Sequence, residues 1–259
     1  MHVVKFAYTA YNQERASAAG SVTLFAAGQF GNGGLTMQYP SAWLQGASLG
    51  ESIASRLRLQ IINEEIKPGE VISENRVAET FGTSRSPVRE ALKMLAGEGL
   101  IRLERMGAVV VGLNLEDVKE LYDVRYLIES FAQQRLAGRD NAALVSQLEQ
   151  GIDRMKLAAK HGDYVEFAYQ DFSFHERIVT EARHTRILHL WNSIRPIVMT
   201  VILLTTEQGF KQGEERMHWV ADKHRMVIEG LRSGSADKIR EVVKAYFDDS
   251  GETLNRSLH

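Results

Sequence analysis

The fold of this chain is decided by residues 75–101, which read NRVAETFGTSRSPVREALKMLAGEGLI. Apolar residues recur at helical spacing on each side of Gly82, and this glycine permits a sharp turn between the two patterns. Ser73 is a good N-cap for the first helix of the pair. Pro87 falls in the first turn of the second helix, where proline is tolerated, and Gly99 ends that helix. The stretch therefore predicts two short helices joined by a tight turn.

Signals on both sides extend this pair into a larger unit. Upstream, Ile53, Leu57 and Ile61 recur at helical spacing, and the turn at Lys67–Glu70 ends that helix. Downstream, the strand-like stretches LIRLE and AVVVG flank a tip that ends in Gly107, which predicts a two-stranded hairpin. We therefore expect residues 47–113 to form a winged helix-turn-helix domain.

A winged helix-turn-helix is typical of DNA binding, because the second helix of the pair fits the major groove. Arg85 and Arg89 are four residues apart, so both project from one helix face and can bind guanine or phosphate. Ser84, Ser86 and the free backbone N–H groups of the helix start suit a phosphate. Two arginines alone would indicate only a solvated helix face, but their place between the first helix and the wing favours DNA contact.

Any basic surface must be local. The 31 basic and 33 acidic residues give a formal net charge of −2, so the whole chain is not a strongly basic nucleic-acid binder. Residues 76–105 hold six basic and four acidic side chains, a net charge of +2. Arg105 and Gly107 at the wing tip are expected to enter the adjacent minor groove, because glycine allows a close backbone approach.

The composition excludes several classes of protein. The chain has no cysteine, which excludes a disulfide scaffold, thiol catalysis and a thiolate metal site, and fits a cytoplasmic location. The longest apolar runs, such as Ile197–Leu204, are too short for a membrane span, so no membrane association is expected. Residues 1–46 contain six glycines and no sustained periodicity. They predict a disordered or non-native extension, with Met37 as the natural initiator; the alternative is an arm that contacts DNA.

The remainder of the chain, residues 114–259, has helical periodicity almost throughout and no strand alternation. Together with the winged domain it gives a mainly α fold, in which an all-α antiparallel helical bundle follows the winged helix-turn-helix. The expected helices cover residues 115–137, 141–160, 163–182, 185–206, 214–232 and 236–255.

Polar residues interrupt the apolar stripes of these helices. Asp171 and His175 lie one i,i+4 step apart on an otherwise apolar face, and His224 and Tyr246 fall on the inward stripes of two later helices. Burying a carboxylate and an imidazole is costly unless each finds a partner. A divalent metal would satisfy both groups. A metal-free hydrogen-bond network is the alternative.

Arginines offer candidates for binding an anionic ligand. Arg125 and Glu129 are also four residues apart on an inward stripe, which predicts either a structural salt bridge or an arginine that binds a carboxylate. Arg195, directly before Pro196, and Asn192 are further candidates from a neighbouring helix, where a kink with solvated side chains is the alternative.

The stretch quoted above resembles the N-terminal domain of the GntR family of bacterial transcription regulators, and the helical remainder resembles the FCD domain of its FadR-like branch. The resemblance covers about residues 49–255. It implies a homodimer that binds double-stranded DNA at a pseudo-palindromic operator and senses a small metabolite, often a carboxylic acid. By position, Arg85, Arg89 and Gly107 match DNA-contacting positions of the family, and Asn75 matches one where the family carries an arginine.

The resemblance also bears on the metal. In metal-binding FCD domains an aspartate and a histidine four residues apart join two further histidines. Asp171, His175 and His224 occupy three of these positions, and Tyr246 occupies the fourth. A neutral phenol is a poor ligand, so either zinc or nickel is held by three residues, with water or an effector carboxylate completing the shell, or no metal binds.

We therefore expect a ligand-responsive transcription regulator and not an enzyme. A metal-dependent hydrolase built on Asp171, His175 and His224 is the first rival, but no separate nucleophile or general base converges in the sequence. An architectural DNA-binding protein without a ligand is the second, and it leaves the inward polar residues without a role.

Overall fold

The computed structural model describes residues 39–105 and 107–257. The chain divides into two compact units between Leu115 and Glu116. The expectation for residues 1–38 of the extension, and with it Met37, lies outside the described residues. Within residues 39–46 of the predicted extension, the structure has a short 3-10 helix, and Tyr39 is buried.

The N-terminal unit has the helix-turn-helix order that the sequence predicts. Its first long helix begins with a capping box, in which Ser48 accepts from the backbone of Glu51 and the Glu51 carboxylate accepts from the backbone of Ser48. The elements are η2 (Ser41–Leu44), α2 (Leu49–Ile62), β1 (Val71–Ile72), α3 (Glu74–Thr80), α4 (Arg85–Gly97), β2 (Ile101–Glu104) and β3 (Gly107–Val110).

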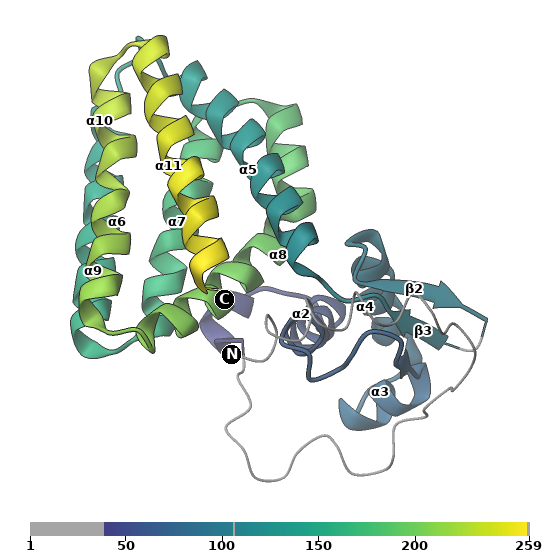
Figure 1. The fold of residues 1–259 in the computed structure, drawn as a ribbon. Helices are drawn as coiled ribbons and strands as arrows, with labels where there is room; N and C mark the ends of the chain where they lie inside the picture. The colour runs from purple at the N-terminus through teal and green to yellow at the C-terminus, as the bar shows by residue number, and fades with distance from the viewer. Residues whose placement is uncertain (1–38, 106, 258–259) are drawn as a thin grey trace. The chain divides into compact units, whose positions relative to one another are not determined.

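The wing is a three-stranded sheet in the order β1-β3-β2, with both pairs antiparallel (Figure 1). The predicted hairpin is β2 and β3, in which Ile101 pairs with Val110. The sequence did not predict β1, where Val71 pairs with Val109, because two residues are too short for an alternation pattern. This extra strand ties the wing to the segment that precedes α3.

The helices α2 and α4 form the core of the N-terminal unit. Leu57, Val88 and Leu95 are fully buried. At one edge of this core, Arg58 donates two hydrogen bonds to Glu98, at 2.6 Å from Nε and 2.5 Å from Nη2, and both side chains are nearly inaccessible. A bidentate pair of this kind fixes geometry as well as charge, so it holds α2 against the end of α4.

The C-terminal unit is a bundle of helices joined by short loops (Figure 1). The sequence expected one helix over residues 214–232, but the structure breaks it at His224, which ends one helix and begins the next. The helices are α5 (Leu115–Arg135), α6 (Ala142–His161), α7 (Tyr164–Glu181), α8 (Thr185–Phe210), α9 (Glu214–Lys223), α10 (Arg225–Ser233) and α11 (Ala236–Ser257).

Helix α8 corrects the sequence-based statement on membrane spans. Its 26 residues are long and apolar enough to cross a membrane by length and composition alone, although the apolar run Ile197–Leu204 is short. The core helix of a soluble protein meets the same criterion. Trp191 and Leu203 of α8 are fully buried, and the Trp191 ring stacks on Phe172 of α7. Helix α8 is therefore packed as a core helix of the bundle.

Candidate functional site

The start of α4 presents the first group of predicted site residues. Ser84 is the N-cap, its side chain makes no capping hydrogen bond, and Ser84, Arg85, Ser86 and Arg89 are all exposed. The backbone N–H groups of this first helical turn point away from the helix, so with the exposed hydroxyl groups they form a surface suited to an anion.

A contact between α3 and α4 positions one of these arginines. Arg89 Nε donates to Glu74 at 2.9 Å, and the Arg89 side chain remains 58% exposed. Because an exposed ion pair contributes little energy, Arg89 is free to exchange this carboxylate for another anion. Asn75, the next residue of α3, is also exposed.

The structure gives Gly107 a role inside the wing. Its φ is +143°, and a Cβ atom there would lie 2.9 Å from Val71 Cγ1 and 3.0 Å from the carbonyl oxygen of Ile72. The glycine is therefore required by the close approach of β1 to β3, whether or not DNA also approaches it. Arg105, at the end of the hairpin, is exposed.

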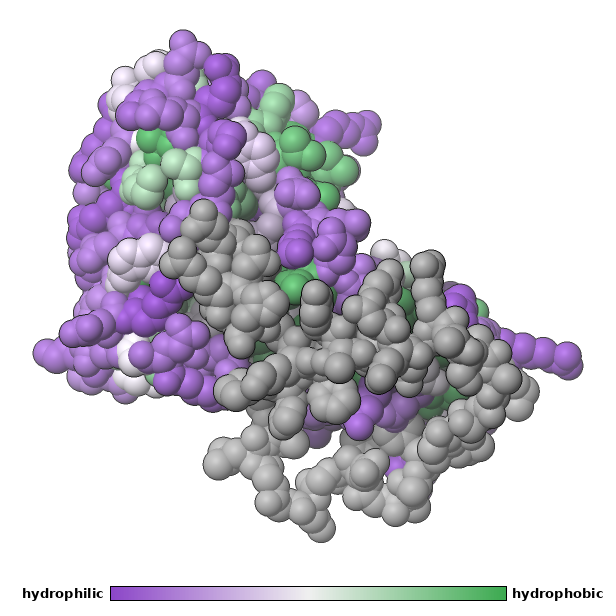
Figure 2. Space-filling model, in the orientation of Figure 1, coloured by the Kyte–Doolittle hydropathy of each residue, from purple (hydrophilic) through white to green (hydrophobic). Residues whose placement is uncertain are grey.

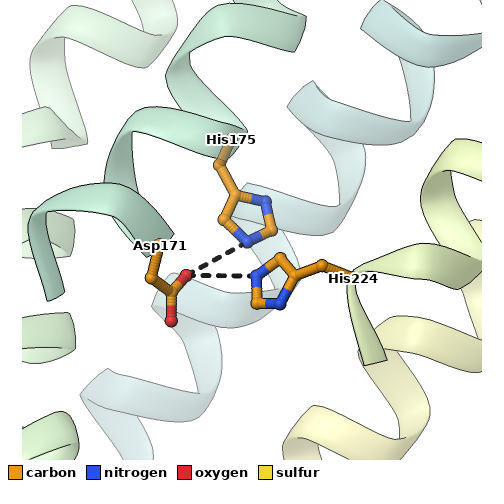
Figure 3. Close-up of side chains that lie close together, drawn as sticks. All are labelled: Asp171, His175 and His224. Atoms are coloured by element: carbon orange, nitrogen blue, oxygen red, sulfur yellow. Dashed lines mark ion pairs between the residues drawn. The ribbon is translucent and has the colours of Figure 1, made fainter. Parts of the chain in front are cut away.

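The polar residues predicted on the inner faces of the bundle converge. Asp171 and His175 come from α7 and His224 from the junction of α9 and α10, and their side chains point toward one another (Figure 3). Asp171 Oδ1 lies 3.5 Å from His175 Nε2 and 3.4 Å from His224 Nε2. One potential ligand atom from each of the three residues lies within 4.8 Å of the other two.

Tyr246 of α11 completes the cluster. Its hydroxyl oxygen lies 3.0 Å from His175 Nε2 and 3.1 Å from His224 Nε2. Burial, and then the charge of Asp171, raise the pKa of Tyr246 well above its usual value. The side chain is therefore a neutral phenol with a single proton to donate.

The other ring nitrogens fix the tautomers of the two histidines. His175 Nδ1 lies 2.5 Å from the Glu129 carboxylate, and His224 Nδ1 lies 2.9 Å from the carbonyl oxygen of Val220. Each Nδ1 therefore carries the proton, because its partner can only accept. Burial works against a charged His175 ring, but the Glu129 carboxylate outweighs it and raises the pKa of His175. Without a second proton, each of the two rings presents a lone pair on Nε2 toward Asp171.

The resulting cluster has too many hydrogen-bond acceptors. Two Nε2 lone pairs and the Asp171 carboxylate face one another, and the Tyr246 hydroxyl supplies one proton to the three of them. Unmatched acceptors are costly in a buried site. A cation, either a further proton or a divalent metal, would give these acceptors a partner. Asp171, His175 and His224 therefore fit as ligands of a metal ion.

Glu129 links this cluster to Arg125. The Glu129 side chain is fully buried and accepts from Arg125 Nε at 3.0 Å as well as from His175. Burial works against the charge of Glu129, but His175 and Arg125 outweigh it and lower the pKa of the carboxyl group. The sequence predicted the pair between Glu129 and Arg125 but not the contact between Glu129 and His175.

The guanidinium of Arg125 is itself held by aromatic rings. It lies 5.0 Å from the ring centroid of Tyr122 and 5.6 Å from that of Phe247, and its side chain is almost inaccessible. Burial disfavours its charge, but Glu129 more than compensates and the pKa of Arg125 is raised. Arg125 is therefore a fixed cation on the wall of the bundle interior.

A cavity of about 110 Å³ opens beside the cluster. This is several times the roughly 10–15 Å³ that one water molecule needs. Arg125, Asp171, His175 and Tyr246, which the sequence singled out, line it. His224 is not among the lining residues but contacts Asp171 and Tyr246. Further lining residues that sequence reasoning did not single out include Tyr122, Thr205, Arg216, Trp219, Lys223 and Ser250.

Two predicted ligand-binding residues do not line this cavity. Asn192 is exposed on α8. Arg195 Nε donates to Glu176 at 2.5 Å, and the guanidinium lies 5.0 Å from the ring centroid of Phe172. Arg195 is thus engaged between α7 and α8, which corrects the expectation that it joins the site.

Comparisons with known proteins match both units of the chain. The family model "Bacterial regulatory proteins, gntR family" matches residues 49–111, and the model "FCD domain" matches residues 120–249. A protein of Bacillus licheniformis named "Gluconate operon transcriptional repressor" is 41% identical over 211 residues, which are 82% of this chain and 87% of that protein. The protein of the same name from Bacillus subtilis is 40% identical over the same shares.

Solved structures show the same fold. The Escherichia coli protein McbR/YncC aligns with a TM-score of 0.63 at 15% identity, covering 82% of this chain and 100% of that one. A Rhodococcus protein described as a putative GntR transcriptional regulator aligns with a TM-score of 0.58 at 22% identity, covering 79% and 96%.

Proposed function

This chain belongs to the GntR family of bacterial regulatory proteins and carries an FCD domain, and we propose that it is a cytoplasmic, dimeric transcription regulator controlled by a small carboxylate. The observation that carries the proposal is the convergence of buried polar side chains from α5, α7, α9 and α11 on one cavity. A bundle built only for stability would fill these positions with aliphatic residues.

The cavity suits an anion. Arg125 offers a fixed guanidinium, and a guanidinium binds a carboxylate with two parallel hydrogen bonds. The two Bacillus relatives are named for a gluconate operon. Their identity to this chain supports a sugar acid of the gluconate type as the effector.

A zinc or nickel ion held by Asp171, His175 and His224 fits the same site. The carboxylate of Glu129 and the carbonyl of Val220 orient the two histidines, as such partners do around metals in other proteins. The bound cation would supply positive charge for an effector carboxylate beside Arg125. Tyr246 then stands beside the ion as a neutral hydrogen-bond donor.

The N-terminal unit would read DNA through the start of α4 and the wing. Arg85 and Arg89 contact base edges or phosphates, and the exposed hydroxyl groups and N–H groups of the helix start bind the backbone. The full set of contacting residues that we propose is Asn75, Ser84, Arg85, Ser86, Arg89, Arg105 and Gly107.

An apolar surface on the bundle supports dimerisation. Val124, Leu127 and Phe131 are exposed on α5, and Leu190 is exposed on α8. Phe131 packs edge-on against His184 at the start of α8, so the two helices adjoin there. Figure 2 shows apolar side chains gathered over this part of the bundle. A second copy covering this face would present two winged domains to a two-fold operator.

The test is a DNA-binding titration. Duplexes selected by the protein from a random pool should contain two related half-sites, and gluconate should change their affinity for the protein at least fivefold. Selected sites without a repeated half-site, or a monomer in sedimentation at micromolar concentration, would contradict the dimer. The alternative of a metal-dependent hydrolase has no support among the relatives named above.

A further inference from the structure

Lys223, the last residue of α9, lies on the cavity wall and takes no part in the Asp171–His175–His224–Tyr246 cluster. Its side chain is only 8% exposed. The ammonium nitrogen lies 4.6 Å from the ring centroid of Tyr246 and 5.7 Å from that of Trp219. A buried ammonium group therefore lies beside the candidate ligand site.

The ammonium group of Lys223 has a donor to spare. It carries three N–H bonds. Among the described residues it pairs with the Asp249 carboxylate and donates to Ser250 Oγ at 2.7 Å. The third N–H is therefore available to an oxygen atom inside the cavity.

The hydroxyl groups of Thr205 and Ser250, on the wall of the same cavity, supply hydrogen-bond acceptors. Ser250 Oγ donates to the carbonyl oxygen of Tyr246 at 2.8 Å, and Thr205 Oγ1 donates to the carbonyl oxygen of Val201 at 2.8 Å. With their protons committed to the backbone, both oxygens can only accept further hydrogen bonds, and both residues line the cavity. This part of the wall thus combines the third N–H of Lys223 with the Thr205 oxygen and the second lone pair of Ser250 Oγ, because the first accepts from Lys223.

A ligand hydroxyl group matches this wall better than a second carboxylate does. A hydroxyl both donates and accepts, whereas a carboxylate only accepts and would leave the Thr205 oxygen without a donor; Ser250 Oγ already accepts from Lys223. Asp249 also neutralises Lys223, so a second anion would meet a carboxylate nearby. We infer that Lys223 reads a hydroxyl group of a polyhydroxylated acid whose carboxylate binds at Arg125. This inference rests on the proposed function and adds the residue that selects among carboxylates.

The experiment compares two acids that share a carboxylate. Gluconate carries a row of hydroxyl groups beyond its carboxylate, whereas propanoate is shorter and has none. In Lys223→Met the dissociation constant of gluconate should rise roughly 10- to 100-fold, the value of one hydrogen bond to a charged group. That of propanoate should stay within about twofold. Isothermal titration calorimetry measures both.

Lys244→Met is the matched control, because Lys244 is an exposed lysine of α11 whose partner is Asp248. It should bind both acids as the unaltered protein does. The methionine keeps the aliphatic stem of Lys223, and the Asp249 side chain is 41% exposed although its Oδ2 is buried, so Lys223→Met should fold with a moderate loss of stability. If it does not, Ser250→Ala decides: it should weaken gluconate binding severalfold and spare propanoate.

The possible contrary results distinguish a failure of the role of Lys223 from a failure of the proposed function. If the unaltered protein binds gluconate and Lys223→Met binds it equally well, the role of Lys223 is wrong and the carboxylate sensor stands. The same conclusion follows if the dissociation constants of gluconate and propanoate rise equally in Lys223→Met. If the unaltered protein binds neither acid, the proposed function fails, and the inference fails with it.

Discussion

Replacing Glu129 with alanine tests the buried polar network directly. This carboxylate is fully buried and accepts from Arg125 Nε at 3.0 Å and His175 Nδ1 at 2.5 Å. Its removal leaves a guanidinium and an imidazole N–H without their acceptor. Removing one partner of a buried pair costs about 3–5 kcal/mol, so the free energy of unfolding should fall by that amount. Glu129→Gln keeps one acceptor and should cost about 1–3 kcal/mol.

Urea denaturation followed by far-UV circular dichroism measures both losses. Glu120→Ala, an exposed position on the same helix, is the control and should change stability by less than about 0.5 kcal/mol. Glu129→Ala should also weaken divalent-metal binding roughly 10- to 100-fold, because His175 loses the partner that orients it. A loss of stability below about 1 kcal/mol, with metal affinity unchanged, would refute the network as described.

Four further variants test the DNA-binding surface, the wing and the metal site. Arg85→Ala and Arg89→Ala should each weaken binding to the selected DNA by about 1–3 kcal/mol if they read bases; equal affinity in gel-shift titrations would remove them from the interface. Gly107→Ala should lower the melting temperature of the protein, because its Cβ would meet Val71 and the Ile72 carbonyl at a strained φ; an unchanged melting temperature argues against the close approach. Tyr246→His should raise zinc affinity, since it adds a fourth ligand beside Asp171; calorimetry showing no gain would place this residue outside the metal shell.

Local patterns were sufficient for much of this structure. The i,i+4 spacing of Asp171 and His175 on an apolar stripe predicted that they share an inward face, because helical periodicity depends only on neighbouring residues. The turn at Gly82 and the hairpin with Gly107 at its tip followed from equally local signals. The GntR resemblance then placed these elements in a known family.

Features that depend on tertiary contacts could not be predicted in this way. Nothing local separates α9 from α10 at His224, where the sequence has neither glycine nor proline, so the two were expected as one helix. Lys223 is adjacent to His224 and off the predicted stripe, yet packing turns it into the cavity. Arg195 was expected at the ligand site, but Glu176 on α7 binds it instead.

Arg125→Ala shows whether the cavity in the bundle controls DNA binding. The measurement is the affinity for the selected duplex with and without gluconate, by fluorescence anisotropy, for the unaltered protein and for this variant. Arg125→Ala should bind the duplex normally without gluconate and no longer respond to it; His175→Ala should behave in the same way. A gluconate response that survives in both variants would mean that this cavity does not control DNA binding.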